Sequence, residues 1–293
     1  MIRALALVFA ALASTVAAAE KPVIAVVNYP LAYFAERLGG DAVEVLFPVA
    51  AERDPAFWRP SLSNIAAIQQ ADLIALNGAG YAAWTTKASL PRSRLVDTSA
   101  PFRSDYIRTE TITHSHGADG EHSHEGVASH TWLDFTLAAR QAETLAAAMK
   151  RRLPDLASAI DEAAAALAAD LAALDEAAKA AAKALNGAPV ITTHPRYQYL
   201  AKAYGIAVQS LEWEAGAAPT DKQWSDLAAL STETGARILV WETEPPAAAR
   251  ATAEAMGFRD IVLPTLANRP ATGDFLSAMQ AGLAELAAFG ANE

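Results

Sequence analysis

The fold is decided by the alanine-rich stretch DLASAIDEAAAALAADLAALDEAAKAAAKAL, residues 155–185. Its alanine, leucine, lysine and acidic residues favour the α-helix, and the pattern stops at Asn186-Gly187. A helix of about 31 residues extends roughly 45 Å at ~1.5 Å per residue. Leu167, Leu171 and Leu174 share one face, so at least one stripe is expected to be buried. We interpret the stretch as a spine between two flanking units, with a solvent-facing coiled-coil arm as the alternative.

Short apolar runs alternate with helical patterns on both sides of this spine. Before it, the expected strands are 23–27, 43–47, 73–76 and 95–97, and the expected helices are 31–38, 62–70, 82–88 and 132–152. After it, the expected strands are 190–193, 208–211, 238–241 and 261–263, and the expected helices are 197–204, 221–234, 246–256 and 275–288. Such alternation is typical of parallel sheets. The predicted fold class is therefore α/β, with two Rossmann-like parallel-sheet lobes joined by a long rigid α-helix.

The N-terminus has the pattern of a secretory signal peptide. Arg3 precedes an apolar run that is too short for a membrane anchor, and Ala17-Ala18-Ala19 forms a small-residue cleavage site. The sequence contains no cysteine, and therefore no acceptor for a lipid anchor, no disulfide and no thiolate metal ligand. We expect a periplasmic protein that is not lipid-anchored. The expected divisions are a signal peptide (1–19), an N-terminal lobe (20–153), a linking helix (154–186) and a C-terminal lobe (187–293).

Charge and motif content exclude several classes of function. The formal net charge of −10 disfavours binding to nucleic acid or to anionic membrane surfaces, and it is compatible with a cationic ligand. The sequence has no His-Glu-x-x-His motif, no Walker-type phosphate loop and no Gly-x-Ser-x-Gly elbow. We therefore expect that the protein is not an enzyme.

Five of the six histidines lie in the segment HSHGADGEHSHEGVASH, residues 114–130. His114, His116, His122 and His124 form two His-x-His pairs mixed with carboxylates, a composition typical of loose binding of Zn²⁺, Ni²⁺ or Cu²⁺. Because ordering such a segment costs conformational entropy, we predict auxiliary metal capture here and not the high-affinity site. Metal binding should weaken below about pH 6, since only neutral imidazole binds metal. A solvated polar tract is the alternative.

Two motifs carry a resemblance to a known family. Residues 129–134 (Ser-His-Thr-Trp-Leu-Asp) contain a His-x-Trp-x-Asp pattern, and residues 193–205 place His194 between a strand and a helix. With the two-lobe architecture, these motifs resemble the metal-specific solute-binding proteins of ABC importers for zinc and manganese. The resemblance covers essentially the whole chain after the signal peptide. It implies that His130 and His194 are metal ligands, and that residues 114–125 are the histidine-rich loop of zinc-importing members.

The chain departs from the family pattern at two expected ligands. Ala56 stands where the family has a histidine, and residues 264–268, around Thr265, lack the usual carboxylate. Zinc needs about four donors at ~2.0–2.2 Å for nitrogen and oxygen, so substitutes are required. A loop histidine such as His122 or His124 is one option, and acids near strand ends are another, namely Glu52, Asp54, Glu212, Glu214, Glu242 and Glu244. Since ligands of open α/β sheets lie at the carboxyl ends of strands, we favour Glu242 and Glu212.

The sequence and the resemblance together predict a periplasmic solute-binding protein that binds a divalent cation. Zinc is the favoured cation. The predicted ligands are His130, His194, Glu242 and Glu212, with Mn²⁺, Ni²⁺ or Cu²⁺ as other candidate metals. The resemblance implies delivery to an inner-membrane ABC permease by a monomeric protein. An alternative is a degenerate member of the fold that binds an organic or chelated-metal ligand, or that acts as an accessory metal sensor or chaperone. Four tryptophans near the expected cleft suggest it, namely Trp58, Trp132, Trp213 and Trp241.

Overall fold

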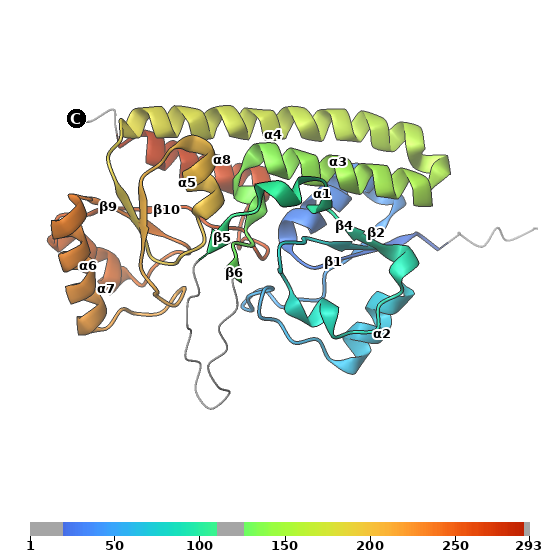
Figure 1. Cartoon of the computed structure of the whole chain (residues 1–293), viewed down its shortest axis with the longest axis horizontal. Helices are drawn as coiled ribbons and strands as arrows, with labels where there is room; N and C mark the ends of the chain where they lie inside the picture. The colour runs from blue at the N-terminus through green and yellow to red at the C-terminus, as the bar shows by residue number, and fades with distance from the viewer. Residues whose placement is uncertain (1–19, 110–125, 290–293) are drawn as a thin grey trace, which may run out of the picture.

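The protein is a two-lobed α/β molecule in the computed structural model, which describes residues 20–109 and 126–289 (Figure 1). The first half contains β1 (Val23–Val26), α1 (Tyr29–Gly39), β2 (Glu44–Leu46), α2 (Leu62–Gln70), β3 (Leu73–Leu76) and β4 (Leu95–Asp97). The second half contains β7 (Val190–Thr192), α5 (Gln198–Tyr204), β8 (Val208–Ser210), α6 (Asp221–Thr234), β9 (Ile238–Trp241), α7 (Ala247–Ala255), β10 (Arg259–Val262) and α8 (Phe275–Ala287). Helices α3 (Phe135–Arg152) and α4 (Ala157–Leu185) lie between them in the chain.

The two halves are built on parallel sheets of the same topology. Their strand orders are β2-β1-β3-β4 and β10-β9-β7-β8, so the first strand of each half has a neighbour on either side. This arrangement creates the switch point at which open α/β sheets bind ligands, beyond the carboxyl ends of the strands. In the second half Thr192 is in register with Val240. His194 and Glu242 therefore leave neighbouring strands at the same level of the sheet.

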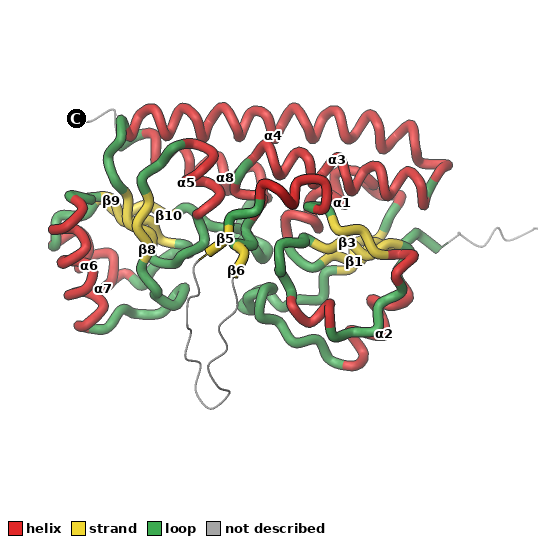
Figure 2. The backbone as a smooth tube through the Cα atoms, viewed as in Figure 1, coloured by secondary structure: helices red, strands yellow, loops and turns green. Residues whose placement is uncertain are grey.

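Helix α4 is the spine that the sequence predicts. It packs against α1 of the first half, against α3, and against α5 and α8 of the second half, and both sheets lie beneath it (Figure 2). Leu167, Leu171 and Leu174 are fully buried in an apolar core that continues from one half into the other. The helix ends where Asn186 adopts a left-handed conformation, with φ of 48°. In the described part of the chain, no helix is long and apolar enough to cross a membrane.

Two expected helices differ in the structure, and one strand pair was not predicted. Residues 82–88 form only a short 3₁₀ turn (Ala83–Thr86), because Ala82 before it has a positive φ of 54°. Helix α3 starts at Phe135 and not at Trp132, because the Asp134 carboxylate caps it by accepting the backbone N–H groups of Thr136 and Leu137. Strands β5 (Arg108–Thr109) and β6 (Gly126–Val127) form a short antiparallel pair. They frame the segment 110–125.

The segment after β10 ties the second half to the first. The backbone N–H of Tyr29 donates to the carbonyl oxygen of Ala267 at 2.9 Å. The Asn268 amide donates to the carbonyl oxygens of Ala50 and Arg53, each at 2.7 Å. These bonds place Ala267 and Asn268 beside the start of α1 and beside the loop that follows β2.

Candidate functional site

A cavity of about 170 Å³ lies between the two halves. The first half contributes Ala56, Phe57, Thr109 and residues 127–130, and the second contributes His194, Pro195, Arg196 and Gln198. Both histidines predicted as ligands therefore share its wall. Ala56, which replaces an expected histidine, lines it as well.

His130 presents a neutral imidazole to this site. Its exposed fraction is 6%, and its ring packs against Trp132 at a centroid separation of 4.8 Å. Burial lowers the pKa of His130 well below the usual 6.5, and interactions with Arg196 and His194 lower it further. The buried Nε2 atom has no hydrogen-bond partner among the described residues. An unsatisfied buried nitrogen costs about 1–3 kcal/mol, and a metal ion would satisfy it.

A buried amide network fixes the backbone on both sides of His130. The Asn77 side chain donates to the carbonyl oxygen of Ser129 at 3.0 Å. Gln141, on α3, donates to Asn77 Oδ1 at 3.2 Å and accepts from Thr131 Oγ1 at 3.0 Å. Sequence reasoning missed Asn77 and Gln141, because isolated polar residues within apolar patterns give no signal of a shared network.

His194 is held in a ring orientation that suits metal binding. Its Nδ1 lies 2.8 Å from the carbonyl oxygen of Trp213. Because a carbonyl oxygen only accepts hydrogen bonds, Nδ1 is the donor, so the neutral ring has its lone pair on Nε2. A backbone carbonyl that orients a histidine in this way is typical of the surroundings of metal ligands.

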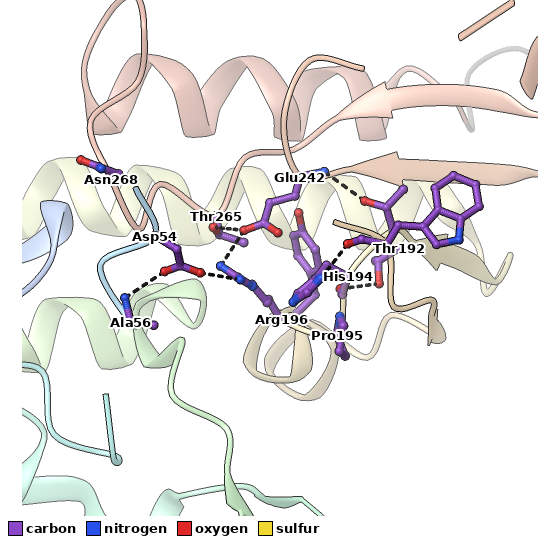
Figure 3. Close-up of polar contacts among 12 residues, drawn as sticks. Asp54, Ala56, Thr192, His194, Pro195, Arg196, Glu242, Thr265 and Asn268 are labelled. Atoms are coloured by element: carbon purple, nitrogen blue, oxygen red, sulfur yellow. Dashed lines mark hydrogen bonds and ion pairs between the residues drawn. The ribbon is translucent and has the colours of Figure 1, made fainter. Parts of the chain in front are cut away.

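Glu242, the favoured carboxylate, is already paired. Its Oε1 lies 3.0 Å from Arg196 Nη1 and accepts a hydrogen bond from Thr265 Oγ1 at 2.8 Å (Figure 3). Its Oε2 is buried without a partner among the described residues. Thr265 lies in the stretch where a carboxylate was expected. It has no carboxylate of its own, but it donates a hydrogen bond to Glu242, which follows the neighbouring strand β9.

The predicted ligand set is not assembled in this conformation. Glu212 is exposed, neither Glu212 nor Glu242 is among the residues that line the cavity, and Glu242 is paired with Arg196. Within residues 20–109 and 126–289, no three histidine or acidic side chains form a group that could hold a metal ion. The auxiliary residues His114, His116, His122 and His124 lie outside the described residues, although Thr109 and Val127, which flank that segment closely, line the cavity.

The tryptophans serve packing and do not line the cavity. Trp132 is fully buried, and its indole N–H donates to the carbonyl oxygen of Thr265 at 2.7 Å. Trp213 and Trp241 pack together in the apolar core of the second half, and Trp58 packs against Trp84. The cavity residues in the described chain include none of the four predicted tryptophans. The aromatic-cleft alternative therefore loses its support.

Comparisons with known proteins agree on one family. A family model described as ZnuA, zinc-uptake complex component A, periplasmic, matches residues 24–289. The zinc-binding lipoprotein AdcA of Streptococcus pneumoniae serotype 4 is 27% identical over 190 residues, which cover 61% of this chain and 36% of that protein. The high-affinity zinc uptake system protein ZnuA of Bacillus subtilis is 27% identical over 190 residues, which cover 61% of this chain and 57% of that protein.

A solved structure shares the fold. The Zn(II)-bound ZnuA-like domain of AdcA from Streptococcus pneumoniae superposes with a TM-score of 0.76 at 21% identity. The match covers 92% of this chain and 98% of that domain. The predicted fold of two parallel-sheet lobes joined by a helix is thus confirmed. Whereas this match covers nearly all of the solved domain, the sequence alignments cover only 36% of AdcA and 57% of the Bacillus subtilis ZnuA.

Proposed function

The chain belongs to the ZnuA family of periplasmic zinc-uptake components, and we propose that it captures a divalent metal ion, zinc, for an ABC-type importer. The observation that carries this proposal is the position of His130 and His194, which come from different halves and line one cavity. Each has an Nε2 atom suited to a metal: that of His130 is buried without a described partner, and that of His194 is freed by its bond to Trp213. The protein acts as a carrier that hands its cargo to an inner-membrane permease.

The donors favour zinc among the candidate metals. Two imidazole nitrogens suit Zn²⁺ better than Mn²⁺, which prefers oxygen ligands, while Ni²⁺ and Cu²⁺ compete in vitro. The candidate for a third donor is Glu242, which is buried, has an unpartnered Oε2 and pairs with the cavity residue Arg196. Glu212 is a weaker candidate because it is exposed. Solvent completes the coordination. The periplasmic location, the cleavage after residue 19, the domain boundaries and the monomeric state stay predictions of the sequence.

We expect the histidine-rich segment to assist capture without forming the tight site. Deleting residues 114–125 should remove weak zinc binding and leave the affinity of the tight site unchanged, because His130 and His194 lie beyond the deletion. A competitive zinc titration against a chromophoric chelator, on protein starting at Glu20, measures both classes of site. A variant with a glycine-serine segment of the same length controls for the loss of chain length. Loss of tight binding in both variants would place the principal ligands within the segment.

A further inference from the structure

Arg196 lies where the two halves meet and pairs with a carboxylate from each. Its Nη2 atom is 2.6 Å from Asp54 Oδ2 in the first half, and its Nη1 atom is 3.0 Å from Glu242 Oε1 in the second (Figure 3). The side chains of Arg196, Asp54 and Glu242 are 12%, 26% and 7% exposed. The largely buried guanidinium of Arg196 thus lies between two carboxylates, those of Asp54 and Glu242.

Two hydrogen bonds from the positions that lack an expected metal ligand hold these carboxylates in place. The backbone N–H of Ala56 donates to Asp54 Oδ1 at 2.8 Å, which orients the other oxygen toward Arg196. Thr265 donates to Glu242 at the same oxygen that Arg196 contacts. The site therefore holds two carboxylates in place around one cation.

Three buried polar atoms near the guanidinium have no described partner: Tyr81 Oη, His130 Nε2 and Glu242 Oε2. Glu242 contacts Arg196 directly, His130 lines the same cavity as Arg196, and the Arg196 charge lowers the pKa of both Tyr81 and His130. Tyr81 also packs edge-on against His130 at a centroid separation of 6.0 Å. Buried polar groups are nearly always satisfied in folded proteins, so this cluster indicates a site that completes its bonding with a ligand.

We propose that Arg196, Asp54 and Glu242 form a latch in which the guanidinium is an internal cation that zinc must displace. This inference rests on the proposed function. Arg196 neutralises both carboxylates and holds the halves together while the protein is free of metal. A divalent ion that enters between His130 and His194 competes with it for Glu242, and the guanidinium swings out of the pair. The latch explains why His130, His194 and Glu242 are not grouped as a metal site in this conformation. It also makes the affinity for zinc lower than that of a site with the same three donors and no arginine.

The test compares two replacements of Arg196 by competitive zinc titration. Arg196→Gln removes the charge but keeps an amide donor for Glu242, and it should tighten zinc binding at least about tenfold, since a positive charge near the ion is lost. Arg196→Lys keeps the charge and should bind zinc much as the unaltered protein does. Arg250→Gln is the matched control, because Arg250 also contacts two carboxylates, Glu244 and Asp260, but does not line the cavity.

The outcomes separate the latch from the proposed function. Tighter binding in Arg196→Gln than in the unaltered protein, which disappears when His130 and His194 are also replaced, supports the latch. Unchanged or weaker binding in Arg196→Gln, with histidine-dependent binding in the unaltered protein, overturns only the latch. No cleft binding in any variant overturns both.

A second measurement does not depend on the folding of Arg196→Gln, in which Glu242 loses its charged partner. In unaltered protein labelled with ¹⁵N-arginine, saturating zinc should shift the guanidinium resonances of Arg196, assigned with Arg196→Lys. Unmoved resonances at saturation of the histidine site would contradict the displacement.

Discussion

Replacing both His130 and His194 by alanine should weaken tight zinc binding by at least about 100-fold, because each supplies one of few available donors and even supporting residues of metal sites are worth 10- to 100-fold. The two side chains enter the same cavity from different halves, so neither can substitute for the other. A competitive chelator titration on metal-stripped protein gives the change in dissociation constant. Folding of the variant is checked by its circular dichroism.

Glu212→Gln provides the matched control for this prediction. Glu212 was a candidate ligand from the sequence, but it is exposed and outside the cavity, so its replacement should leave the affinity unchanged. Tight zinc binding that survives loss of both histidines would move the site elsewhere in the chain. Weakening by Glu212→Gln alone would mean that the loop after β8 folds over the ion.

Trp132→Ala should lower the free energy of unfolding of the metal-free protein by about 3–5 kcal/mol, the usual cost of truncating a buried aromatic side chain. The ring is 0% exposed and packs against both His130 and Tyr81, at centroid separations of 4.8 and 5.5 Å. Its N–H bond to Thr265 also connects the two halves. Chemical denaturation followed by circular dichroism measures the loss.

Trp132→Phe separates packing from hydrogen bonding in this prediction. It keeps an aromatic ring but leaves the carbonyl oxygen of Thr265 without its donor, so it should cost less than Trp132→Ala. A loss below about 1 kcal/mol in Trp132→Ala would show that the cavity left behind collapses, and that Trp132 does not join the halves.

The fold was largely predictable because its elements depend on local patterns. The spine helix has a buried leucine stripe and a clear stop at Asn186, and α2, α6, β3, β4 and β9 have the predicted bounds. Errors arose where a single residue overrides a pattern, as at the capping Asp134 and at Ala82 with its positive φ. Strands β5 and β6 were not predicted because each is too short to show the alternation of apolar and polar residues that marks a strand.

The site was predictable only in part. His130 and His194 stood out through their flanking motifs, and Glu242 through its position after a strand. The pairing of Arg196 with Asp54 could not be read from the sequence, because the two residues are 142 positions apart and meet only when the halves come together. For the same reason the hydrogen bond from Thr265 to Glu242 could not be predicted, because the two residues follow different strands.

Anomalous diffraction at the zinc edge, from crystals of the metal-loaded protein, tests most directly whether zinc binds between the halves. We expect one strong peak in the cavity, about 2.0–2.2 Å from Nε2 of both His130 and His194, with Arg196 moved away from Glu242. A cavity without a peak at saturating zinc, or peaks at surface histidines alone, would contradict a zinc site in the cleft.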